Sequence, residues 1–143
     1  MGGFLFLTVN AINIFSFLMF LSRVHFENFA SVFGLFALLA AIPAALIGVI
    51  NLLQKAPFFS WFPALVYASW GVLDLFLDHL YKIEFRQPMR PAILVPFLVL
   101  YYGSIAGMGF SFWKVNFSFW LICAITSALN VSAAFYAILN GKG

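Results

Sequence analysis

The chain has 143 residues, of which 65% are hydrophobic and only 8% are charged, and its formal net charge is +3. Soluble domains carry about 25% charged residues, so this composition excludes an ordinary water-facing surface. No basic cluster indicates a nucleic-acid partner. The mean hydropathy of +1.08 predicts an integral membrane protein whose surroundings are the lipid bilayer.

Five apolar stretches follow one another along the chain, at residues 2–22, 29–53, 58–80, 91–113 and 117–139. Each is long enough to cross a hydrocarbon core of about 30 Å as a helix. Helices are expected rather than barrel strands because the stretches are continuously apolar and do not alternate. Residues 1–143 are therefore predicted to form one all-α domain, a polytopic bundle of about five transmembrane helices.

Prolines and small residues within these stretches indicate how the helices pack. Pro43, Pro63 and Pro96 are expected to kink the spans without ending them, since neighbouring groups can satisfy the freed carbonyls. Small residues form a row in the second stretch and a GxxxG pattern in the fourth: Gly34, Ala37, Ala41, Ala44 and Gly48, then Gly103 and Gly107. Small residues let helix backbones approach closely. Packing inside the bundle is the expected use, and a homodimer face is the alternative.

The end of the third stretch carries the most informative polar residues. Four charged residues follow one another there at intervals of four: Asp74, Asp78, Lys82 and Arg86. If the helix continues as far as Gln87, these residues lie along one of its sides, with acids before bases in the order that favours ion pairs. An ordinary interpretation is a helix end in the headgroup region, stabilised by an Asp78–Lys82 pair.

Asp74 does not fit that ordinary interpretation. It lies about two turns inside the expected membrane boundary, where an unpaired carboxylate costs about 2.5–3.5 kcal/mol. Asp74 is therefore expected to face the bundle interior and to have a partner. The candidate partners are Tyr67 on the same side of the helix, an amide such as Asn13 or Asn130, or a basic side chain that reaches inward. The amides are also expected to form hydrogen bonds between helices. The alternative is that they take part in binding a polar ligand or an ion, for which the candidate residues are Asp74, Asp78, Tyr67, Asn13 and Asn130.

Two carboxylates four residues apart suggest several kinds of chemistry. They could bind a cation, accept a proton, or hold Mg²⁺ against a phosphate. The metal ligands would then be Asp74, Asp78 and His79, and the contacts to a phosphate headgroup would be Lys82, Arg86 and Arg90. The chain has only four acidic residues, and it contains no Walker loop, HExxH or CxxC motif that would identify a cofactor.

The sequence favours a non-enzymatic membrane protein. Its expected role is to bind or translocate a small or lipid-like ligand through a polar site near the cytoplasmic helix ends, around Asp74. The first alternative is an integral-membrane enzyme that acts on a phosphate-bearing lipid, with the Asp pair holding a metal. The second is an accessory subunit of a larger membrane complex, and a homo-oligomer also stays open.

Loop charges predict the orientation in the cell membrane. Two basic residues, Lys55 and Lys114, fall on one side of the predicted spans. Five fall on the other side: Arg23, Lys82, Arg86, Arg90 and Lys142. Lys and Arg accumulate on the cytoplasmic side, so the N-terminus is expected outside and the C-terminus in the cytoplasm.

This orientation predicts which positions are accessible from outside intact cells. A cysteine substituted at Gly2 should react with a membrane-impermeant thiol reagent, and one substituted at Gln87 should be protected, because the two positions lie on opposite sides of the membrane. Labelling of Gln87 from outside would contradict the predicted orientation.

Overall fold

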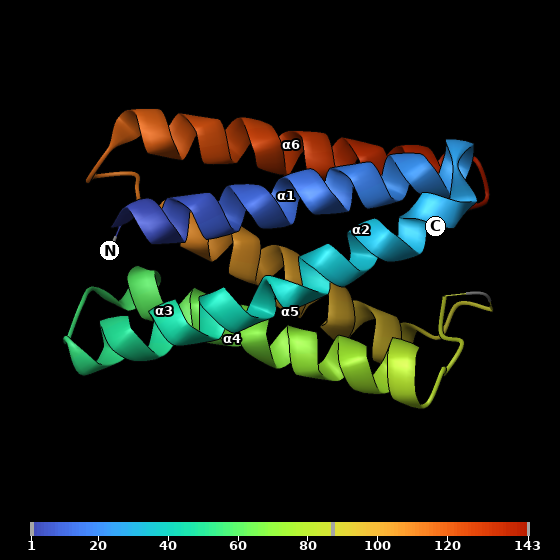
Figure 1. The fold of residues 1–143 in the computed structure, drawn as a ribbon, viewed down its shortest axis with the longest axis horizontal. Helices are drawn as coiled ribbons and strands as arrows, with labels where there is room; N and C mark the ends of the chain where they lie inside the picture. The colour runs from blue at the N-terminus through green and yellow to red at the C-terminus, as the bar shows by residue number, and fades with distance from the viewer. Residues whose placement is uncertain (1, 87, 143) are drawn as a thin grey trace.

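The computed structural model describes residues 2–86 and 88–142 (Figure 1). In these ranges every regular element is helical: α1 (Gly2–His25), α2 (Glu27–Leu39), α3 (Ala41–Leu53), α4 (Phe58–Asp74), the π-helix η1 (Leu75–Leu80), α5 (Pro91–Phe110) and α6 (Phe117–Leu139). Because α2 continues into α3 and α4 into η1, five helices are long and apolar enough to cross a membrane. The predicted all-α architecture and the number of span-length helices are confirmed.

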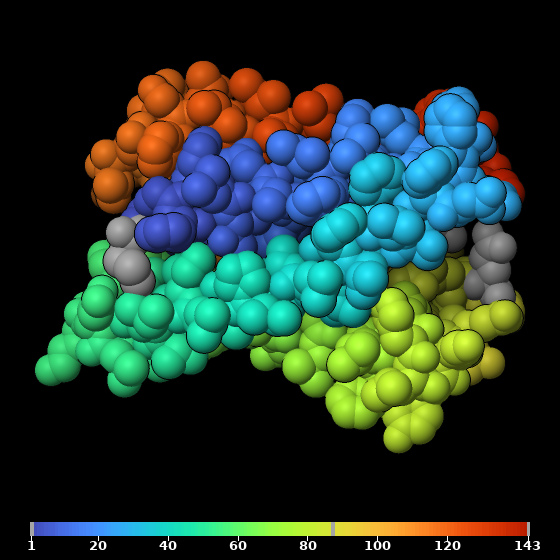
Figure 2. Space-filling view, viewed as in Figure 1, coloured from blue at the N-terminus to red at the C-terminus, as the bar shows by residue number. Residues whose placement is uncertain are grey.

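The described helices form a bundle in which α1 and α4 each pack between two neighbours. α1 packs along α2 and α6, and α4 packs along α3 and α5. Figure 1 shows α6 and α1 along one edge, α3 and α4 along the opposite edge, and α5 behind them. In the space-filling view, α1 and the α2–α3 rod cover the facing side of the molecule (Figure 2). α5 and α6 are consecutive in the chain, yet they touch each other much less than α1 and α6 do.

The fourth predicted span is shorter than expected. α5 ends at Phe110, whereas the apolar stretch continues to Trp113. The chain leaves the helix through tight turns, in which the amides of Phe112 and Trp113 donate to carbonyls three residues earlier. Asn116 then caps α6, because its side chain accepts a hydrogen bond from the amide of Phe119 at 3.2 Å. Apolar residues therefore continue into a turn that hydropathy alone assigns to the helix.

The prolines lie within the spans and do not end them, as expected. Pro63 and Pro96 lie inside α4 and α5. Near Pro43, the single residue Ala40 separates α2 from α3 and keeps helical backbone angles. Proline cannot donate the hydrogen bond that would continue the helical ladder, and the α2–α3 rod continues on both sides of this point (Figure 1).

Small residues bring helices into close contact inside the bundle. A Cβ atom added at Gly71 would lie 2.6 Å from the Cβ of Ala41, and one at Gly48 would lie 2.7 Å from a side-chain methyl of Leu65. α4 therefore approaches the α2–α3 rod more closely than larger residues would allow. In the GxxxG pattern, Gly107 packs against Pro63, whereas a Cβ added at Gly103 would meet no atom within 4 Å in the described part of the chain.

The different surroundings of the two glycines give a matched pair of variants. Gly107→Leu should destabilise the fold by about 1–3 kcal/mol, because its Cβ would lie 2.7 Å from the ring of Pro63. Gly103→Leu places the same side chain in open space on the same helix and should be tolerated. Thermal unfolding in detergent measures both, and equal melting temperatures would refute the packing role of Gly107.

Candidate functional site

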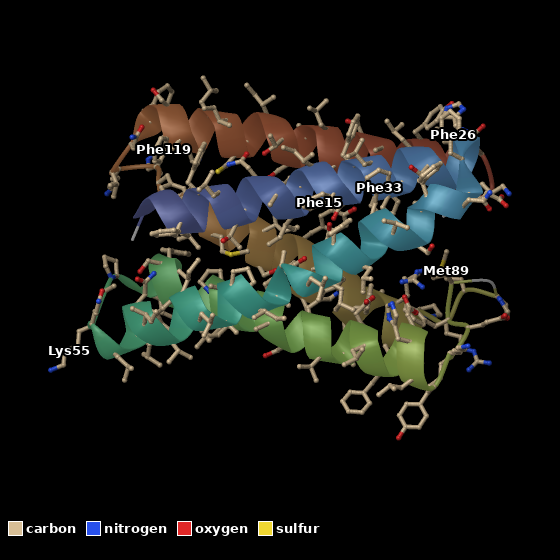
Figure 3. All side chains as sticks on the ribbon, in the orientation of Figure 1. Phe15, Phe26, Phe33, Lys55, Met89 and Phe119 are labelled. Atoms are coloured by element: carbon tan, nitrogen blue, oxygen red, sulfur yellow. The ribbon has the colours of Figure 1, made fainter. Side chains whose placement is uncertain are left out.

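All four acidic residues of the chain lie at one end of the bundle. Glu27 begins α2, Asp74 ends α4, Asp78 lies in η1 and Glu84 follows η1. The opposite end carries Lys55, as Figure 3 shows by the positions of Lys55 and Met89 at the two extremes of the molecule. Positive and negative side chains are thus concentrated where α1, η1 and the segment before α5 meet.

The π-helix η1 changes which residues face one another at this end. In a π-helix, each amide donates a hydrogen bond to the carbonyl five residues earlier. Such turns are rare in proteins, and those that occur are frequently at functional sites. The amide of Tyr81 donates to the carbonyl of Phe76 at 2.9 Å in this pattern. The wider turn brings Asp74 opposite His79, five residues on, with 3.8 Å between Oδ2 and Nδ1. The prediction that Lys82 and Arg86 continue the row of Asp74 and Asp78 along one side of an α-helix is therefore wrong.

The helix ends at the predicted limit of the span, Leu80, and does not continue through Lys82 and Arg86 as the ladder of charges required. Lys82 has φ +48°, a left-handed conformation that does not continue a helix. The amide of Ile83 closes the end of η1 by donating to the carbonyl of Leu77 at 2.8 Å. The chain then folds back, and Phe85 is fully buried. Gln87, the expected helix limit, lies outside the described residues.

Asp78 and Arg86 form a bidentate ion pair that holds this returning segment against the bundle. The two guanidinium nitrogens donate to Oδ1 and Oδ2 at 3.0 and 2.8 Å. The guanidinium also lies 4.5 Å from the ring centroid of Phe85 and 5.4 Å from that of Phe97, as in cation–π contacts. The expected Asp78–Lys82 pair is wrong, because the change of direction at Lys82 carries that side chain away.

Asp74 faces the bundle interior, as expected, and is 8% exposed. Tyr67 is not its partner, since the Tyr67 hydroxyl donates to the carbonyl of Ala37 at 2.8 Å. The nearest ionisable side chain that the structure records beside Asp74 is His79, with 3.8 Å between Nδ1 and Oδ2.

Arg23 is the functional candidate that sequence reasoning missed. It lies in the last turn of α1, is half-buried, and interacts electrostatically with Asp74, Asp78 and Arg86. Among the described residues, no carboxylate lies within ion-pair distance of it. Spacing offered one signal: Arg23 is seven residues after the buried Ser16, and residues seven apart share a helix face.

These five residues, Arg23, Asp74, Asp78, His79 and Arg86, are called the charged cluster below. Lys82 and Arg90, two of the predicted headgroup contacts, are exposed beside it. The third, Arg86, is occupied by Asp78. The charged cluster therefore contains one ion pair, Asp78–Arg86. In the described part of the chain, Arg23 forms no ion pair with an acid, and Asp74 forms none with a lysine or an arginine.

Asn13 and Asn130 belong to a separate amide network, deeper in the bundle, and do not partner Asp74. Asn130 donates to the Asn13 carbonyl oxygen at 3.2 Å and to the Tyr101 hydroxyl at 3.1 Å. Asn13 donates to Thr126 and Ser127 at 3.1 and 3.0 Å. The expectation that amides join helices is confirmed, because these bonds connect α1, α5 and α6.

The amide network extends along α1 in both directions. Towards the charged cluster, the Tyr101 hydroxyl donates to Ser16. In the other direction, Thr126 donates to the Asn10 side chain at 2.8 Å, and Asn10 donates to the sulfur of Cys123 at 3.4 Å. Polar side chains thus line the interior of α1 over several turns.

The donor geometry does not favour the metal alternative. No group of three or more His, Cys, Asp or Glu side chains placed to hold a metal ion occurs in residues 2–86 and 88–142. Asp74, Asp78 and His79 therefore do not form the predicted metal site in this arrangement. Comparisons with protein-family models, with curated proteins and with solved structures found no match to the chain.

The Asp78–Arg86 pair makes a quantitative prediction. In a double-mutant cycle with Asp78→Asn and Arg86→Gln, the coupling energy should be about 0.5–3 kcal/mol, because the pair is bidentate and largely shielded from solvent. The exposed Glu27–Lys142 pair is the control and should show much weaker coupling. Chemical unfolding in detergent gives both values, and equal coupling in the two pairs would refute a structural role for the Asp78–Arg86 contact.

Proposed function

We propose that this protein is a multi-pass membrane protein that binds a lipid-like molecule at the charged end of the bundle. The polar headgroup lies between Arg23 and Asp74, and the apolar chains extend along the lipid-facing helices. Lys82 and Arg90, exposed at the rim, contact the phosphate of the headgroup. The chain is inserted with its N-terminus outside and its C-terminus in the cytoplasm, as the distribution of Lys and Arg favours.

The observation that carries this proposal is the relation between Arg23 and Asp74. Arg23 lies half-buried in the last turn of α1, and Asp74 is 8% exposed. The two side chains form no ion pair with each other within 4.0 Å in the described structure. Charged groups at such depth are costly unless they are paired. A headgroup with an anionic and a hydrogen-bond-donating part would satisfy both side chains at once.

The composition of the charged cluster supports a zwitterionic headgroup. The arginine is a donor with no acceptor function, and the carboxylate is an acceptor when ionised. A phosphate would be held by Arg23, for which phosphate is a well-matched ligand. An ammonium group would be held by Asp74, beside His79. An uncharged headgroup would offer neither side chain a contact of opposite charge.

This proposal predicts that Asp74→Asn preserves folding but weakens lipid binding at least tenfold. Asparagine keeps the shape and hydrogen-bonding capacity of the side chain but loses the charge that attracts an ammonium group. Asp74→Leu removes both properties and should bind more weakly still. The measurement is thermal stabilisation of the purified protein by a phosphatidylethanolamine with short chains, since a ligand that binds the folded state raises its stability by mass action.

Lys55→Gln, at the opposite end of the bundle, is the control for a general loss of charge. An alkyl maltoside, which has no charge, is the control for apolar contact alone and should stabilise all variants equally. Asp78→Asn tests whether the effect belongs to Asp74 in particular. Wild-type stabilisation of both Asp74 variants by the phosphatidylethanolamine would remove the basis of the proposal.

A further inference from the structure

A groove lies between α5 and α6, away from the charged cluster. Its volume is about 240 Å³, and it is lined on α5 by Ile105, Ala106, Gly109 and Phe110, and on α6 by residues that include Trp120 and Ser127. It exists because α5 and α6 pack loosely against each other, while each packs closely on another helix. The groove is therefore open towards the surroundings of the bundle and walled mainly by apolar groups.

Ser127 supplies a hydrogen-bond donor at the inner end of this groove. Its hydroxyl oxygen accepts a hydrogen bond from Asn13 at 3.0 Å, which fixes its position in the amide network. Its own proton has no acceptor among the described residues, in contrast to Thr126, which donates to Asn10 at 2.8 Å. Ser127 is half-buried and lines the groove, so its proton is available to an occupant.

The position of Ser127 sets the depth of the polar contact. Trp120 lies near the start of α6 and Ser127 lies seven residues further along it, which corresponds to a rise of about 10 Å. The donor thus lies well below the helix ends, at a depth where lipid headgroups and their ester groups do not normally lie. The occupant must carry its polar group within an otherwise apolar body.

The hydrogen-bonding groups in the groove lining favour an occupant with a carbonyl group over one with a hydroxyl group. A carbonyl oxygen needs only a donor, which Ser127 provides. A hydroxyl would also need an acceptor for its own proton. The lining has two other polar side-chain atoms. The indole nitrogen of Trp120 only donates, and the sulfur of Cys123 is a weak acceptor that already accepts from Asn10 at 3.4 Å.

We propose that the groove between α5 and α6 binds a membrane-dissolved quinone, with the ring between Phe110 and Trp120 and one carbonyl accepting a hydrogen bond from Ser127. Aromatic walls favour a planar ring, and the groove is smaller than a typical pocket for a whole drug-sized molecule, about 300–1,000 Å³. It therefore holds the ring, while the alkyl or isoprenoid tail leaves through the open side. This site is independent of the headgroup site at Arg23 and Asp74.

The test uses a decyl-substituted benzoquinone and, as the matched probe without carbonyls, decylbenzene. Binding to the purified protein in detergent is measured by quenching of tryptophan fluorescence and by thermal stabilisation. Ser127→Ala should weaken quinone binding about threefold, as expected for one hydrogen bond within a membrane protein. The fold should persist, because Asn13 keeps its bond to Thr126 at 3.1 Å.

Two variants of α5 test the location. Ala106→Phe fills the groove from an exposed position and should reduce quinone binding at least tenfold. Ala92→Phe is the same substitution at another exposed position of α5, outside the groove, and should bind like the wild type. The proposal is overturned if decylbenzene binds as tightly as the quinone, or if Ala106→Phe and Ala92→Phe bind the quinone equally well.

Discussion

The five apolar helices impose one constraint on every polar side chain that they contain. Hydrocarbon offers no hydrogen-bonding partner, so polar groups within spanning helices must find partners in the protein. Many of these polar side chains lie on the inner side of α1. Asn13 anchors the amide network at mid-helix, Ser16 accepts from Tyr101, and Arg23 enters the charged cluster. α1 thereby fixes where α5 and α6 lie relative to α4.

Close helix packing is the second requirement, because it decides which way Asp74 points. Apolar helices in lipid gain little from burying apolar surface, so contact depends on small residues and interhelical hydrogen bonds. Gly71 lies against Ala41, and the Tyr67 hydroxyl donates to the carbonyl of Ala37 at 2.8 Å. Both contacts press the same face of α4 onto the α2–α3 rod. Asp74 lies one turn beyond Gly71 on that face, so it is directed inward.

The sequence predicts the parts of the fold that depend on hydropathy and periodicity. The helix containing Asp74 has the expected limits, Phe58–Leu80, and periodicity within α4 correctly places Asp74 inside. The site beyond it depends on a local change of helix type that no spacing rule includes. Once η1 is a π-helix, Asp74 aligns with His79 instead of continuing an α-helical ladder, and Lys82 turns away. The place of Arg23 in the cluster could not be predicted for another reason. Its charged neighbours come from chain segments more than fifty residues away, and contacts between such distant segments leave little pattern in a single sequence.

The charged cluster also differs from what a purely structural role requires. Anchoring the segment before α5 needs one ion pair, and Asp78–Arg86 supplies it with bidentate geometry and two flanking aromatic rings. Arg23 adds no direct contact to this anchor within the described residues. Among the described residues, the ion pair recorded for Asp74 is the one with His79, at 3.8 Å. It depends on a departure from α-helical geometry that stability alone does not explain, since π-turns are rare. A stable helix end would be simpler to build with apolar residues at both positions, because replacing buried ionic groups by apolar ones is often neutral or stabilising. The two charges that the anchor does not use, on Arg23 and Asp74, are therefore the part of the cluster on which the proposed lipid site rests.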